Sequence, residues 1–422
     1  MADVLKVLMM GGQRAGKTSM LAGLVETMTN GAVNDIIAVK DVTENELASR
    51  KLKNSVESLK RNLKYSCGKT YLIDNGKSAE FEDLTLQFRV PDTDSKMNIV
   101  FSDVSGEYYD MGSYHDVEVR EKIREYDVFL IAIDTPCLME AANPENSLCN
   151  EAINNSYNHA NDMHTFMSEL DDADGKDAKL VIFAPLKCEK WVKDGCVDKV
   201  VERVKKVFES VIHALSQYSN VEIDIMPIQT VGNIVFQEQA KAMLCVINGR
   251  EHRKCAIINN KTQVRFEDGT VEDIDLKKHK FQPDSDAVIR DSSPFVAPNS
   301  WFTTVGKEYA PNNCDQLAYY ILQFYLAKAL FARDVERLQE KKQRWKWGRR
   351  IAIAASCAFG LAGATVMYFT SKYLERKFGT FTLERMLAVI KKLQDGGYIK
   401  KNCDGIVTIK ESKLNAIKEI TA

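Results

Sequence analysis

Eight residues near the N-terminus, GGQRAGKT (Gly11–Thr18), have the types and spacing of a loop that binds phosphate groups. Glycines let the backbone curl so that several N–H groups point inward, and the start of a following helix adds partial positive charge. Lys17 is expected to reach the β- and γ-phosphates, and the Thr18 hydroxyl to bind Mg²⁺. The pattern predicts a nucleotide site formed by Gly11, Gly12, Gln13, Arg14, Ala15, Gly16, Lys17, Thr18 and Ser19.

The surrounding sequence predicts the elements that such a loop requires. Residues 4–10 (VLKVLMM) are apolar enough for a buried strand, and apolar residues recur at helical spacing from Met20 to Met28. Further strand-like runs at 126–134, 179–187 and 221–230 alternate with helical segments such as 198–217. This alternation predicts an α/β fold, a three-layer P-loop NTPase with a mostly parallel sheet.

A second motif, MNIVFSDVSGE, places Asp103 at the end of a strand, followed by Gly106 and Glu107. A strand-end turn is the plain interpretation of Asp-x-x-Gly. Downstream of a phosphate loop, however, it resembles the GTPases of the translation-factor and Ras-like branch. That resemblance implies that Asp103 orders the Mg²⁺ shell and that the Gly106 N–H contacts the γ-phosphate.

The same resemblance gives Glu107 the place where Ras-like proteins usually have a glutamine that positions the attacking water. A carboxylate there could accept a hydrogen bond from water or act as a base, and a solvated charge is the other interpretation. Gln13 replaces a glycine that many Ras-like loops carry. The hydrolysis machinery thus departs from the family pattern at two positions.

The run KLVIFAPLK ends in Pro185-Leu186-Lys187-Cys188-Glu189, where the family has Asn/Thr-Lys-x-Asp. The resemblance implies that Lys187 lies along the purine ring and that Glu189 accepts from guanine N1 and N2. Thr230, Val231 and Gly232 fall where the family has its second base-contacting loop. An exposed Lys-x-Glu on a loop is the alternative, because Leu186 and Glu189 differ from the motif.

The switch threonine of such proteins lies between the phosphate loop and Asp-x-x-Gly. Thr70 is the candidate by position alone, with Thr43 and Thr85 as competitors. The expected metal site is therefore Thr18, Asp103 and Thr70, with Mg²⁺ and GTP or GDP as cofactors.

More than 80 residues separate Lys17 from Asp103, and the amphipathic segment 44–65 accounts for part of this length. The arrangement over residues 4–330 resembles predicted bacterial double-GTPase-type proteins of conflict and defence systems, within the TRAFAC clade. That resemblance implies a nucleotide-controlled component of a defence (antiphage) or signalling operon, with a protein partner that the sequence does not identify.

The expected domain organisation has five parts. A GTPase domain with an enlarged switch region at 44–98 comes first, and a polar stretch with turn signals suggests an inserted hairpin and loop. A long closing helix, capped by Asn313 and Gln316, a membrane helix and a small α+β tail follow. In this order, the GTPase domain spans 1–245, the inserted hairpin and loop 246–300, the closing helix 301–347, the membrane helix 348–371 and the tail 372–422.

Residues 351–370 carry no charge and would form a helix of about 30 Å, the thickness of a bilayer core. Lysines and arginines flank the segment on both sides, more of them before it than after. This bias predicts a single-pass membrane protein with a cytoplasmic GTPase domain and the last 50 residues outside. A buried core helix is the alternative; a small-residue ribbon through Gly360 would favour a homo-oligomer.

The composition excludes several other classes. The net charge of −2 gives no overall field for nucleic acid, and no nucleic-acid partner is expected. The ten cysteines include no pair at zinc-ligand spacing, which is typical of reduced thiols in the cytosol. The start of the chain lacks the pattern of a signal peptide.

Three functions remain open from the sequence. The first is a membrane-anchored GTP-binding protein that hydrolyses GTP slowly and acts as a switch. The second is an ATPase, if Lys187 and Glu189 do not read a base. The third is a scaffold that binds nucleotide without hydrolysis and carries a membrane effector helix.

Overall fold

The computed structural model describes most of the first 324 residues and a short piece of the tail. The described residues are 4–12, 14–30, 38–65, 68–72, 82–89, 96–103, 123, 125–143, 148–168, 170, 179–218, 221–241, 243–259, 261–283, 298–314, 317, 320, 321, 324 and 407–408.

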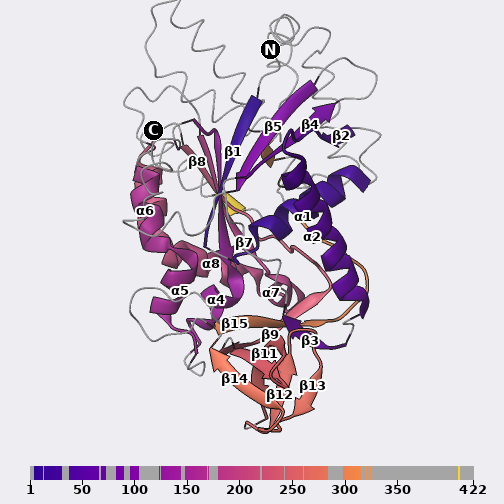
Figure 1. Ribbon diagram of the computed structural model, residues 1–422. Coiled ribbons are helices and arrows are strands. Elements are labelled where there is room, and N and C mark those ends of the chain that lie inside the picture. The colour runs from indigo at the N-terminus through magenta and orange to yellow at the C-terminus, as the bar shows by residue number, and fades with distance from the viewer. Residues whose placement is uncertain are drawn as a thin grey trace, which may run out of the picture.

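An eight-stranded sheet forms the centre of the molecule, and its inner strands are parallel (Figure 1). The pairs β1–β5, β1–β6, β6–β7 and β7–β8 are parallel, whereas β4, β2 and β16 add antiparallel edges. This confirms the predicted α/β fold. In sheet order the strands are β16 (Val407–Thr408), β8 (Val221–Ile225), β7 (Lys179–Leu186), β6 (Val128–Asp134), β1 (Val4–Met10), β5 (Lys96–Asp103), β4 (Glu82–Arg89) and β2 (Ala38–Asp41).

Helices cover both faces of this sheet. Successive residues of the inner strands point to opposite faces, and the residues on both faces are apolar, so both faces must be buried. In β1, Val7 and Met9 join the core under α1 and α2, and Leu8 and Met10 join the core under α6, α8 and α9. Figure 1 shows α1 and α2 on one side of the sheet and α6 on the other. The helices are α1 (Lys17–Asn30), α2 (Glu46–Tyr65), α4 (Thr135–Glu140), α5 (Glu151–Asn158), α6 (Ala160–Ser168), α7 (Glu189–Lys193), α8 (Val197–Val207) and α9 (Glu209–Ser216).

The predicted strand 221–230 is shorter in the structure and ends at Ile225. The Met226 N–H still donates to the Phe183 carbonyl beyond this point. The chain continues beside β7, where the Ile228 N–H donates to the Pro185 carbonyl. The loop after β8 is thereby carried to the end of β7.

The inserted region is larger than the hairpin and loop expected from the sequence. Five antiparallel strands form one sheet, and a further sheet of β3, β15 and β9 joins it to the GTPase core. We call these two sheets the β module (Figure 1). Its strands are β3 (Thr70–Leu72), β9 (Ile234–Lys241), β10 (Met243–Ile247), β11 (Glu251–Ile258), β12 (Gln263–Phe266), β13 (Val271–Asp273), β14 (His279–Pro283) and β15 (Pro298–Thr304).

The start of the expected long helix is described only in part. Leu317, Ile321 and Phe324 are helical and buried in the core that also holds α1. The side chain of Asn313 donates to the Pro227 carbonyl, so it ties the helix start to the loop after β8. The capping partner Gln316 lies outside the described residues.

Within the described part of the chain, no helix has the length and apolar character needed to cross a membrane. The expected span at 348–371 lies outside the described residues. In the tail, β16 pairs with β8 at the edge of the central sheet. This pairing opposes the expectation that the last 50 residues lie across a membrane from the GTPase domain.

Candidate nucleotide site

The loop between β1 and α1 depends on its glycines. Gly11 and Gly16 have φ values of 135° and 112°, which residues with a side chain rarely adopt. A Cβ atom on Gly11 would lie 2.4 Å from the Ala132 carbonyl oxygen, and one on Gly12 would lie 1.9 Å from that of Tyr157. The backbone can therefore pass close to β6 and α5 only because these positions lack side chains.

Lys17, the first residue of α1, is buried at the mouth of this loop. Its Nζ donates to the carbonyls of Gly11 at 2.8 Å and Gly12 at 3.2 Å, and lies 4.0 Å from the Asp103 carboxylate. Burial lowers the pKa of Lys17, and the charge of Asp103 opposes this shift. An ammonium held this way is positioned to exchange loop carbonyls for phosphate oxygens.

The structure brings two of the three predicted metal ligands together. The Thr18 hydroxyl donates to the Asp103 carboxylate at 3.4 Å, although 85 residues separate them in the chain. A hydroxyl and a carboxylate beside a phosphate loop are the oxygen donors that Mg²⁺ prefers, so these two residues fit the Mg²⁺ ion that the sequence resemblance implies. Thr18 and Asp103 would hold it together with phosphate oxygens.

Thr70 lies elsewhere, in β3 of the β module, where its hydroxyl is hydrogen-bonded to that of Thr303 at 2.7 Å. The competitors are also engaged in local structure: the Thr43 hydroxyl donates to Asp41 and accepts from the Thr85 N–H. Gln13, Gly106 and Glu107 lie outside the described residues, so their roles stay predictions.

Lys187 follows β7 and reaches across to the phosphate loop. Its Nζ lies 2.5 Å from the Arg14 carbonyl oxygen and 2.6 Å from Asp134 Oδ2. Its Cε would be 3.5 Å from a Cβ on Gly16, so the aliphatic stem runs along the loop. The residue expected to lie along the purine is thus joined directly to the residues expected to hold the phosphates.

Glu189, the first residue of α7, is buried and joins the two expected base-contacting segments. Its Oε1 accepts from the N–H groups of Val231 at 3.0 Å and Gly232 at 3.3 Å. Burial raises the pKa of Glu189, and these backbone N–H groups oppose the rise. Thr230, beside them in the chain, is also buried. An exposed Lys-x-Glu is therefore excluded at Glu189.

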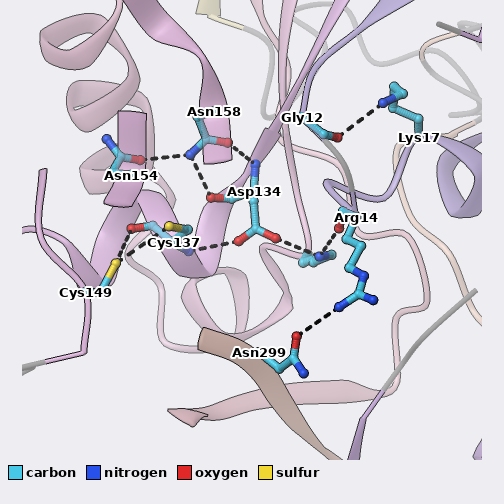
Figure 2. Close-up of polar contacts among 10 residues, drawn as sticks. Gly12, Arg14, Lys17, Asp134, Cys137, Cys149, Asn154, Asn158 and Asn299 are labelled. Atoms are coloured by element: carbon cyan, nitrogen blue, oxygen red, sulfur yellow. Dashed lines mark hydrogen bonds and ion pairs between the residues drawn. The ribbon is translucent and has the colours of Figure 1, made fainter. Parts of the chain in front are cut away.

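Two contributors to this site were not singled out from the sequence. Asp134 pairs with Lys187, and Asn299, from β15, accepts from Arg14 Nη1 at 3.2 Å. Figure 2 shows Asp134 close to Asn158 and the Arg14 side chain pointing toward Asn299. A strand-end carboxylate in YDVFLIAID, like that of Asp103, was a signal for Asp134. Nothing in the pattern marked Asn299, which is 285 residues from its partner.

The site thus has two halves joined through Lys187. The glycine loop, the buried Lys17 ammonium and the N-terminus of α1 suit a polyphosphate. The Lys187 stem, Glu189 and the loop at 230–232 form the neighbouring half.

A family model described as Double-GTPase 2 matches residues 7–231, which is more than half of the chain. The chain belongs to the Double-GTPase 2 family. It is a GTP-binding protein with a P-loop α/β fold. A search of curated proteins finds no match to this Double-GTPase 2 chain.

Similar solved structures are remote. The signal recognition particle receptor complex SRb-GTP/SRX from Chaetomium thermophilum is 11% identical, with a TM-score of 0.31 over 55% of this chain and 93% of that one. The GTP-bound GTPase-like domain of S. cerevisiae Ski7 is 10% identical, with a TM-score of 0.29 over 71% and 75% of the two chains. The family assignment rests on the family model, because likenesses at this level add no weight of their own.

The burial of Glu189 makes stability depend on pH. A folded-state pKa above the ordinary value of 4.5 means that the unfolded chain loses its proton first, so stability falls as pH rises above 4.5 toward the folded-state pKa. Glu189→Gln removes the charge but keeps an oxygen that can accept from Val231. The thermal midpoints of the variant and the wild type would be measured without nucleotide. The midpoint of the variant minus that of the wild type should increase as the pH rises from 4.5 to 7.5.

Glu202→Gln, at an exposed glutamate on α8, is the matched control and should follow the wild-type curve. A constant difference between Glu189→Gln and wild type across this pH range would contradict a buried, titrating Glu189.

Proposed function

We propose that this protein is a membrane-anchored GTPase that hydrolyses GTP slowly and works as a nucleotide-controlled switch in a bacterial defence or signalling system. Family membership supports guanine-nucleotide binding. Hydrolysis, the anchor and the biological setting are the parts that we add.

The observation that carries the proposal is the junction of the two halves of the site at Lys187. A purine held along the Lys187 stem would have its Watson–Crick edge read by Glu189, whose pKa the charge of Lys187 acts to lower. Glu189 Oε2 is buried and has no hydrogen-bond partner among the described residues, so an acceptor is available there. Guanine offers paired N–H donors on that edge and adenine does not, which favours guanine over adenine.

The hydrolytic role falls to Glu107, which would orient or deprotonate the attacking water. Glutamate in place of glutamine departs from the Ras-like pattern, which supports slow turnover. Nucleotide exchange between GTP and GDP would then act on the switch region that contains α2. The buried face of α2 contacts both the GTPase core, through Leu52 and Val56, and the β module, through Leu59 and Leu63.

The anchor is proposed from the uncharged segment at 351–370 and its basic flanks. Because β16 pairs with β8, the proposal assigns no side of the membrane to the tail.

Nucleotide selectivity tests the guanine assignment. The full-length protein with Mg²⁺ should bind labelled GTP, with unlabelled GTP and GDP competing at least tenfold better than ATP. Lys17→Ala should abolish binding, because it removes the ammonium that is expected to meet the phosphates, and the thermal midpoint of the nucleotide-free variant checks that it folds. Competition titrations at equilibrium measure both effects.

A preference for ATP would overturn the guanine assignment and favour an ATPase. Measuring GTP turnover by the same preparation distinguishes the hydrolysing switch from the scaffold that binds nucleotide without hydrolysis. GTP hydrolysis should be measurable and should change in Glu107→Gln; binding with no hydrolysis in either protein would favour the scaffold.

Membrane fractionation tests the anchor. The full-length chain should stay in the membrane pellet after an alkaline carbonate wash, and a chain ending at residue 347 should move to the supernatant. A control that replaces residue 360 by leucine (Gly360→Leu) keeps the apolar span and should stay in the pellet. Release of the full-length chain by carbonate would contradict a transmembrane anchor.

A further inference from the structure

Asp134 ends β6, the strand between β1 and β7 in the central sheet. Only 4% of its side chain is exposed, and its Oδ2 lies 2.6 Å from Lys187 Nζ. Carboxylates are rarely buried to this extent unless a charge and hydrogen bonds compensate them. The other hydrogen bonds of Asp134, made by its second carboxylate oxygen and by its backbone, show what holds the residue in this place.

The carboxylate is fixed from its own helix. Asp134 Oδ1 accepts from the Cys137 N–H at 2.9 Å, which caps the N-terminus of α4. Since one oxygen belongs to the cap, the other is aimed at Lys187.

The backbone of Asp134 is fixed by α5. Asn158 accepts from the Asp134 N–H at 2.7 Å and donates to the Asp134 carbonyl at 3.3 Å, and Asn154 accepts from the same Asn158 amide at 2.8 Å. These contacts are drawn in Figure 2. Both asparagines are buried, so the network is shielded from water and rigid.

Lys187 itself needs such support. Its φ of 59° lies in the left-handed region that side chains seldom adopt, and its side chain crosses from β7 to the phosphate loop. A lysine stem has four rotatable bonds and loses much freedom when held. With the Arg14 carbonyl as its sole acceptor, the ammonium would have one neutral partner in a largely buried place.

We propose that Asp134 is a positioning residue for guanine-nucleotide binding. It fixes the Lys187 ammonium against the phosphate loop, so that the stem presents one defined surface to the purine. The inference rests on the proposed function, because it assigns Asp134 to the site where Lys187 meets the nucleotide. Asp134 acts through Lys187 and makes no contact with the nucleotide in this proposal.

A double-mutant cycle on the full-length protein separates positioning from a general contribution to stability. The variants are Asp134→Asn, Lys187→Met and the double variant, and the readout is the dissociation rate of a fluorescent GDP. Asparagine keeps the cap on α4, and methionine keeps the stem without the charge. Asp134→Ser removes the same charge, also caps helices well, and replaces Asp134→Asn in the cycle if the latter does not fold.

Asp134→Asn should accelerate GDP dissociation about tenfold, which equals about 1.4 kcal/mol. Lys187→Met should accelerate it at least as much, and the double variant should match Lys187→Met within about twofold. Independent, multiplying effects would overturn the inference, as would a normal dissociation rate in Asp134→Asn. Failure of the wild type to bind GDP would instead refute the proposed function.

Discussion

The contact of the Lys187 ammonium with the Arg14 carbonyl and the Asp134 carboxylate is the interaction on which the site depends. It joins the ends of three neighbouring strands, β1, β6 and β7, at one edge of the sheet. Parallel strands bring their carboxyl ends to a common edge, and ligands bind there in open α/β sheets. By contacting Arg14 and Asp134, Lys187 fixes the position of the phosphate loop relative to the base-contacting segments.

The β module is built against the same segments, which gives it a direct physical connection to the site. The Trp191 ring on α7 stacks on Phe236 of β9 at 5.8 Å, two residues after the buried Glu189. A Cβ on Gly232 would lie 1.9 Å from the Ala310 carbonyl oxygen, so the loop bound by Glu189 also packs closely on the chain after β15. A shift of this loop must therefore be accommodated by the module, because packed interiors have few voids to absorb it.

The sequence predicted most of what is local. Glycines in GGQRAGKT, the apolar strand before them and the strand-end Asp103 each carry their signal within about ten residues, and the structure places Thr18 of that loop beside Asp103. The sequence did not predict which distant residues contact each other. Asp134 is 53 residues from Lys187 in the chain, and Asn299 is still farther from Arg14, so only the fold shows these pairs. Thr70 was chosen by its order in the chain, which does not encode that β3 pairs with β15. The short β strands were underestimated because polar alternation in 246–300 gives a weak signal.

Hydrogen exchange tests most directly whether the two halves form one guanine-nucleotide site. Exchange of backbone N–H groups would be compared in the full-length protein with and without GDP and Mg²⁺, with Lys17→Ala as the control. The account predicts that nucleotide slows exchange together at 11–19, 186–190 and 230–233, and at none of them in the control. Slowing confined to 11–19 would contradict it, because Lys187 and Glu189 would then take no part in binding.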